Sequence, residues 1–214
     1  MKTFFKLSVV AALVLAPLLA VPARADVLFN NIGLPVLAPF SGADPVSNTL
    51  YASFSTSSQG LMLSSLALEL DAVTPNDGGL INVVLASDAF GVPGKGLRLL
   101  GQINDSILTT SPSVYTFSES VPLAANTRYW IKLAQTAGTS SSAYWAYAGS
   151  SAGVGVYSEY DYNTGNSPAL SVNSLGLGVY MMTVSAVPEP TSLALYAGAL
   201  TILGVVASSR RRRS

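Results

Sequence analysis

Short segments in which apolar and polar residues alternate are the main pattern of this chain. Residues 50–55 alternate Leu, Ala and Phe with Tyr, Ser and Ser, and in residues 65–70 leucines alternate with Ser, Ala and Glu. A period of two residues places every second side chain on the same face, as in a half-buried β-strand. We therefore predict a strand in each segment.

Further strands and turns follow at short intervals. Similar apolar segments occupy residues 80–87, 97–103, 114–118, 127–134, 143–148, 154–159 and 175–185. The sequence TPNDGG at residues 74–79 contains strong turn formers and predicts a hairpin that joins the second strand to residues 80–87. The sequence VPGKG at residues 92–96 predicts another turn before the strand at 97–103.

The number and spacing of these strands predict the fold class. Eight or nine short strands are separated by residues rich in Gly, Ser, Asn and Pro, and no apolar period of helical length lies among them. Such a pattern indicates an all-β protein. We expect a single antiparallel β-sandwich, jelly-roll-like, over residues 26–186, which is long enough for one hydrophobic core.

The N-terminal residues 1–25 have the features of a signal peptide. Lys2 and Lys6 precede an apolar segment at residues 7–20, and Ala23, Arg24 and Ala25 form an A-x-A cleavage site. We expect cleavage before Asp26 by signal peptidase, which implies export. The alternative is an anchor helix that stays attached.

The C-terminal residues 187–214 consist of three different parts. Pro188, Glu189 and Pro190 favour an extended chain, because proline lacks a backbone donor and restricts the residue before it. Residues 191–209 carry no charge and as a helix reach about 28 Å, close to a hydrocarbon core of about 30 Å. Four arginines, Arg210, Arg211, Arg212 and Arg213, then predict a cytoplasmic C-terminus that stops transfer. The alternative is a buried C-terminal helix with a solvated basic end.

This order of a Pro-Glu-Pro motif, one apolar helix and a terminal arginine cluster resembles the PEP-CTERM sorting signal of exopolysaccharide-producing Gram-negative bacteria. The resemblance implies recognition and cleavage by a membrane-embedded exosortase. It also implies a single-pass intermediate in the inner membrane, followed by delivery to the cell surface or the extracellular matrix.

A second resemblance covers most of residues 51–147. The motifs are FST at residues 54–56, LSSL at 63–66, PG at 93–94 and LAANTRYW at 123–130. Together they resemble the choice-of-anchor R domain, found in surface proteins with alternative C-terminal sorting signals. The resemblance implies a β-sandwich without an assigned activity.

Composition excludes several classes of chemistry. The chain has no cysteine and no histidine, so it can form no disulfide, no Ser-His-Asp triad and no His-ligated zinc site. Residues 26–186 contain four basic and ten acidic residues, which gives a net charge of −6. An acidic domain without a basic patch argues against nucleic acid as a partner.

Aromatic residues are the candidate ligand contacts. Trp130, Trp145 and Tyr147 lie in a part of the chain rich in tyrosine, and exposed rings of this kind can stack on sugars. The alternative is core packing. Alternation places residues 129, 131 and 133 on one face of a strand and residues 128, 130 and 132 on the other, so Trp130 is either exposed or covered by basic side chains.

Acidic residues leave two further alternatives open. Oxygen ligands for calcium occur at residues 71, 76 and 77 and at residues 159, 161 and 163, although neither group matches a defined calcium loop. Two carboxylates could also hydrolyse a glycosidic bond. We expect neither a metal, a cofactor nor an enzyme. The leading hypothesis is an exported surface or matrix protein associated with exopolysaccharide, the first alternative is a carbohydrate-binding module, and the second is a glycosidase.

Overall fold

The computed structural model describes residues 25–35, 43–45, 49–72, 78–136, 142–146, 148, 159, 161–163 and 180–189. Within these ranges the protein is all-β, and its strands form two antiparallel sheets. One compact unit runs from Ala25 to Val187. The arrangement described below is that of this unit.

The first sheet has six strands. It contains β1 (Asp26–Asn30), β2 (Ala43–Pro45), β4 (Leu61–Ala72), β7 (Ser113–Leu123), β9 (Ala143–Ala146) and β11 (Met182–Pro188). The strand order is β1-β11-β4-β9-β2, and β7 pairs with β4 as well. Because Leu70 is opposite Ser113 of β7 and also opposite Trp145 of β9, these two strands flank β4 on opposite sides.

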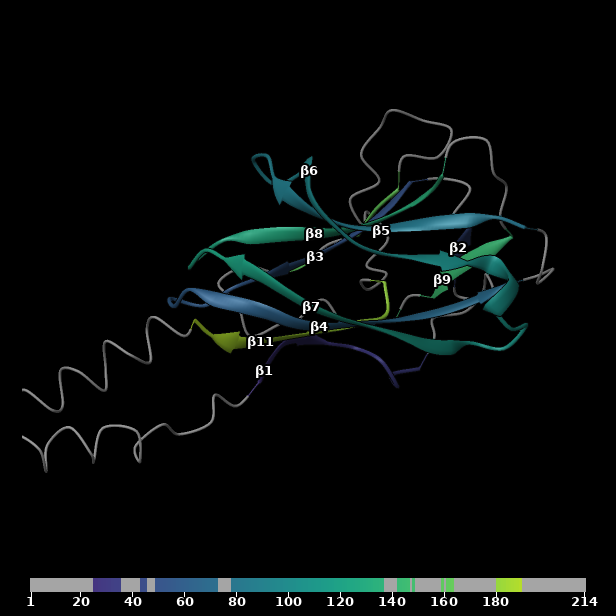
Figure 1. The fold of residues 1–214 in the computed structure, drawn as a ribbon, viewed down its shortest axis with the longest axis horizontal. Coiled ribbons are helices and arrows are strands. Elements are labelled where there is room, and N and C mark those ends of the chain that lie inside the picture. Colours follow the sequence, from purple (N-terminus) through teal and green to yellow (C-terminus); the bar gives the residue numbers. More distant parts are fainter. Residues whose placement is uncertain are drawn as a thin grey trace, which may run out of the picture. The chain divides into compact units, whose positions relative to one another are not determined.

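The second sheet has five strands. It contains β3 (Leu50–Ser55), β5 (Leu80–Asp88), β6 (Pro93–Asn104), β8 (Arg128–Gln135) and β10 (Asp161–Asn163), in the order β10-β3-β8-β5-β6. One turn of 3-10 helix, η2 (Asp105–Ile107), connects β6 to the first sheet. Figure 1 shows the sheets as two layers, with β6, β5, β8 and β3 on one side and β7, β4, β11 and β1 on the other.

Four antiparallel pairs are nested in the sequence. β5 pairs with β6, β4 with β7, β3 with β8, and β1 with β11. Successive pairs belong to alternate sheets, so the chain resembles a long hairpin folded over itself. The ends of the unit therefore meet, and Asp26 is opposite Ala186.

Both sheets contribute to one hydrophobic core. In β4, Leu63, Leu66, Leu68 and Leu70 are buried, and they pack with leucine, isoleucine and valine side chains of β5 and β8. The spacing between Leu63 and Leu66 breaks the period of two, and a shift of register between Leu63 and Ser65 absorbs the extra residue. Burial of each leucine contributes about 2 kcal/mol to folding, which makes this strand the centre of the core.

Two predictions about the turns are wrong. The strands at residues 65–70 and 80–87 do not form a hairpin, because β4 and β5 belong to different sheets. The turn predicted at residues 92–96 lies earlier, at Ala89–Val92, and Pro93 already begins β6. Proline can begin a strand, since this position needs no ladder donor.

Three short strands were not expected from the sequence, namely β1, β2 and β10. The strand predicted at residues 154–159 lies outside the described residues except for Glu159, which is in no strand. No helix within the described ranges has the length and apolarity of a membrane span. The span predicted at residues 191–209 lies outside those ranges.

Candidate functional site

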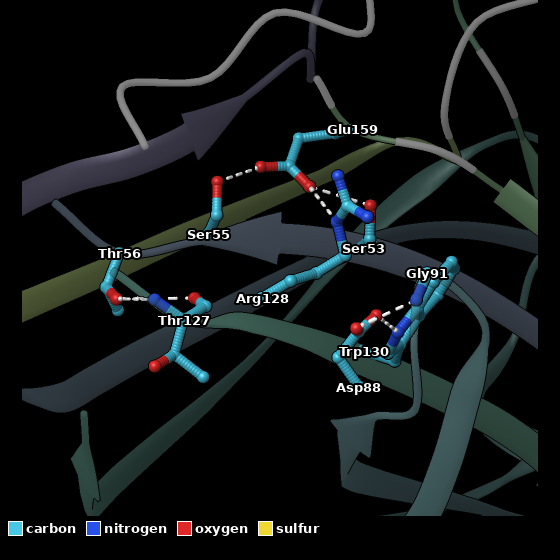
Figure 2. Close-up of polar contacts among 9 residues, drawn as sticks. All are labelled: Ser53, Ser55, Thr56, Asp88, Gly91, Thr127, Arg128, Trp130 and Glu159. Carbon is cyan, nitrogen blue, oxygen red and sulfur yellow. Dashed lines mark hydrogen bonds and ion pairs between the residues drawn. The ribbon is translucent and has the colours of Figure 1, made fainter. Parts of the chain in front are cut away.

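A buried carboxylate lies against the outer face of the five-stranded sheet. Glu159 is 1% exposed, and its two oxygens accept hydrogen bonds from the hydroxyls of Ser53 (2.7 Å) and Ser55 (2.5 Å). Both serines are on β3 and point away from the core, as alternation with Ala52 and Phe54 requires. Figure 2 shows Glu159 above this strand, held by the two hydroxyls.

The environment of Glu159 changes its titration. Burial raises the pKa of this carboxyl, because a charge in a low-dielectric surrounding is disfavoured, while the hydrogen bonds from Ser55 and Ser53 and the nearby Arg128 partly oppose that effect. Arg128 Nε lies 3.9 Å from a Glu159 oxygen. Since Arg128 is the first residue of β8, this contact links the carboxylate to the end of the sheet.

The turn between β5 and β6 has an unusual residue at its tip. Ala89 N–H donates to the carbonyl of Val92 (2.8 Å), and the two residues between them have positive φ, 58° at Phe90 and 88° at Gly91. Positive φ at both central positions is the signature of a type I′ turn, which favours Asn-Gly. Phenylalanine is a poor residue for this conformation, and here its side chain is fully exposed.

Asp88 braces this turn. One carboxylate oxygen accepts from Gly91 N–H (2.9 Å), and the other accepts from Trp130 Nε1–H (2.9 Å). Figure 2 shows both bonds converging on Asp88. Because Trp130 belongs to β8, the two bonds of Asp88 connect the turn between β5 and β6 to β8.

The neighbouring turn, between β7 and β8, is fastened to the end of β3. Thr56 is buried, and its hydroxyl donates to the Ala124 carbonyl (2.6 Å) and accepts from Thr127 N–H (3.0 Å). Asn126 N–H donates to the Ser57 carbonyl (2.7 Å). Asn126 has φ of 49°, a conformation that asparagine tolerates better than most residues.

The two turns border a polar hollow of about 350 Å³. Its lining residues are Asp88 and Gly91 from the first turn and Asn126, Thr127 and Arg128 from the second. The turns are adjacent because β5 and β8 are paired, with Ser87 opposite Tyr129. The hollow thus offers a carboxylate, a guanidinium, an amide and a hydroxyl at one end of the sheet.

The structure corrects the candidate sugar contacts. Trp130 is 1% exposed and Trp145 is fully buried, so neither indole presents a surface on which a sugar can stack. Trp145 donates to the Met181 carbonyl (3.0 Å) and stacks on Tyr180, with ring centroids 4.7 Å apart. Trp130 is therefore not exposed on the polar face of its strand, and Tyr147 lies outside the described residues.

Three of the residues predicted for processing are described by the structure. Ala25 is exposed and directly precedes β1, Pro188 is the last residue of β11, and Glu189 follows it. Ala23, Pro190 and the arginines at 210–213 lie outside the described residues. Among the described residues, no group of three or more acidic side chains is arranged to hold a metal ion.

The residues of the hollow were not recognised as a site from the sequence. Nothing in the sequence indicates that the segment LAANTRYW at residues 123–130 lies beside Asp88 and Gly91. One local signal is present, because an aspartate three residues before a glycine is a common pattern of β-turns. The pairing of β5 with β8, which joins the two turns, has no local signal.

A scan against protein-family models finds no match to the chain, and a search of curated proteins finds none similar to it.

Proposed function

We propose that this chain is an exported, non-enzymatic surface or extracellular-matrix protein that is sorted through its C-terminal tail. The observation that carries the proposal is the ordered tail: Pro188, Glu189 and Pro190, then the uncharged residues 191–209, then the arginines at 210–213. The resemblance to a PEP-CTERM signal rests on these residues.

The ends of the folded unit support this proposal. β1 begins at Asp26, directly after the proposed cleavage site, and β11 ends at Pro188, the first residue of the sorting motif. The strands therefore begin directly after the proposed N-terminal segment and extend two residues, Val187 and Pro188, into the C-terminal one. Removal of either segment leaves the described pairing of β1 with β11 intact.

The proposed route has two processing steps. Signal peptidase cleaves before Asp26, and residues 191–209 hold the chain in the inner membrane until an exosortase acts. The product then reaches the cell surface or the extracellular matrix, where exopolysaccharide is the proposed partner. The arginines keep the tail in the cytoplasm until cleavage, because cationic flanks resist translocation.

The strand order supports a jelly-roll form of the β-sandwich. Four nested pairs, β5–β6, β4–β7, β3–β8 and β1–β11, alternate between the two sheets. A jelly roll consists of two sheets built from eight strands. The remaining strands β2, β9 and β10 extend the sheets beyond this set.

The contacts of Glu159 and Asp88, the two carboxyl groups nearest this end of the sheet, favour a binding or structural role for it over glycoside hydrolysis. Glu159 is 1% exposed and accepts hydrogen bonds from two serines, so a polysaccharide does not reach it. Asp88 accepts two N–H groups that hold a turn. A glycosidase requires two accessible carboxyl groups on either side of the bond that it cleaves.

Intact-mass measurement of the protein from its own cells tests the sorting proposal. We expect a product that begins at Asp26 and lacks the apolar segment and the arginines. The double substitution Pro188→Ala and Pro190→Ala should leave the tail attached, and Pro112→Ala, at an exposed proline after η2, is the matched control. A mature wild-type protein that retains Ser214 contradicts the proposal.

A further inference from the structure

A fully exposed aromatic residue is next in the sequence to a residue that lines the polar hollow. Phe90 has the highest relative exposure among the exposed large apolar residues, and it directly precedes Gly91, which lines the hollow. No apolar contact with the described residues explains this side chain, because a ring that is completely exposed buries no surface against them.

The backbone at Phe90 adds to this anomaly. A φ of 58° favours glycine or asparagine, whereas a bulky residue in this region is strained. Strained residues cluster at functional sites, where the surrounding structure holds them in place. Asp88 provides that support, because its carboxylate bonds Gly91 N–H on one side and Trp130 on the other.

The hollow offers polar groups that remain available to a ligand. The Asn126 side chain is exposed and makes no hydrogen bond to the described residues. Each Asp88 oxygen accepts one N–H and can accept a second hydrogen bond. The hollow therefore combines both acceptors and donors within reach of a bound molecule.

We propose that Phe90 and this hollow form a binding site for an uncharged sugar unit of a polysaccharide. The apolar face of a sugar ring packs on the Phe90 ring, and its hydroxyls bond to Asn126 and Asp88. A concave site with a few convergent polar groups beside an aromatic surface suits such a ligand. This inference rests on the function proposed above, because it names a ligand for that surface protein. The residues of the site lie within the folded unit.

The charge of the site favours a neutral sugar over an acidic one. Asp88 lines the hollow, and Glu159 lies 3.9 Å from the Nε of Arg128, which is the cationic residue among the described residues that line it. A uronic acid would bring a further carboxylate toward Asp88. We therefore expect weaker binding to polyuronates than to neutral glucans.

The test is affinity electrophoresis of the full-length protein in native gels that contain either dextran, other neutral glucans or alginate. The wild-type protein should be retarded by at least one neutral glucan. Phe90→Asn should raise the apparent dissociation constant about tenfold or more, because the stacking surface is lost while the backbone remains acceptable. Asn126→Gly, which also tolerates positive φ, should weaken retardation by a smaller factor.

The matched control is Ile107→Asn. Ile107 is also an exposed apolar residue, but it lies in η2 at the opposite end of β6 from the turn. This variant should be retarded like the wild type. The melting temperature of each variant, measured by circular dichroism, distinguishes lost binding from lost folding.

Three outcomes overturn the proposal. One is a wild-type protein that no neutral glucan retards, and another is undiminished retardation of Phe90→Asn. The third is binding to phosphatidylglycerol vesicles that Phe90→Asn abolishes, which would make the ring a membrane contact instead. Because none of these variants changes residues 210–213, failure of the sorting proposal has a separate readout in the intact mass.

Discussion

Each of the two turns that border the hollow has a residue other than glycine with a positive φ, but the two residues differ in type. Asn126 has φ of 49°, and its short polar side chain suits the left-handed region. Phe90 has φ of 58°, and its side chain does not. The backbone conformation is enough to explain an asparagine at position 126. It does not explain a phenylalanine at position 90, so the explanation must come from what the Phe90 ring does.

The largest effect should come from removing the brace of the Phe90 turn. Asp88→Ala leaves Trp130 Nε1–H and Gly91 N–H without their acceptor, and the indole is buried. We expect the free energy of unfolding to fall by about 3 kcal/mol, measured by urea denaturation. Ser87→Ala, one residue earlier, is the control and should change little, because its hydroxyl makes one long bond of 3.4 Å. Equal stability of Asp88→Ala and the wild type would show that the turn needs no brace.

The other turn should be less sensitive to loss of its fastening. Thr56→Val keeps the shape of the side chain but leaves Thr127 N–H without the hydroxyl that accepts from it. Because Thr56 also contacts Ala124, we expect a loss of about 2 kcal/mol in urea denaturation. Thr56→Ser, which retains the hydroxyl, should recover most of this loss. If valine and serine give the same value, the hydroxyl does not hold the turn.

An exchange of residue types between the turns tests the comparison directly. Phe90→Asn should raise the free energy of unfolding by about 1 kcal/mol, because it relieves strain and gives up no buried surface. Asn126→Phe should lower it by a similar amount. Thermal unfolding of the two variants gives opposite shifts in this case. A loss of stability in Phe90→Asn would mean that the ring makes contacts within the fold.

The smallest expected effect is on how the free energy of unfolding depends on pH, and it comes from Glu159, which lies near Arg128. The pKa of Glu159 is raised by burial, so the folded protein binds its proton more tightly than the unfolded chain. This contribution to stability is complete below the unfolded pKa and is lost as the pH rises through the folded pKa. The free energy of unfolding of the wild type should therefore decline with rising pH above the usual range of a glutamate.

Glu159→Gln should reduce this decline, measured by urea denaturation from about pH 4 to about pH 8. Some decline should remain, because burial also raises the pKa of Glu69 and Asp71 on β4. Thr183→Val, at an exposed hydroxyl bond to Asn30, is the control and should keep the wild-type profile. Identical profiles for Glu159→Gln and the wild type would show that Glu159 titrates normally.

The strands could be predicted well wherever alternation was strong. Leu66, Leu68 and Leu70 are all buried, and Leu50, Ala52 and Phe54 share the core face of β3. Alternation identifies a strand and its buried face but does not say which strand is its partner. The predicted hairpin between residues 65–70 and 80–87 failed for this reason, since the chain crosses to the other sheet there.

The site was harder to predict because it depends on contacts between distant residues. Trp130 lies on the polar face of β8 by alternation, and burial of that face could not be deduced from the strand itself. Glu159 is more than a hundred positions from Ser53 in the sequence. The turn at Phe90 lacks the Asn-Gly sequence that marks a type I′ turn, so the rule for such turns did not apply.

The position of β11 has a consequence for the order in which the chain can fold. Among the described strands, β11 lies between β1 and β4, so the first of them gains its described partner only when the last of them has been made. Pairing across such a long stretch of sequence is slow, because the entropy of closing the loop must be overcome before any contact forms. During synthesis β1 therefore cannot pair with β11 until the whole unit has been made. The residues proposed for sorting begin at Pro188, the last residue of β11, so a chain that exposes this motif has also supplied the strand that pairs with β1.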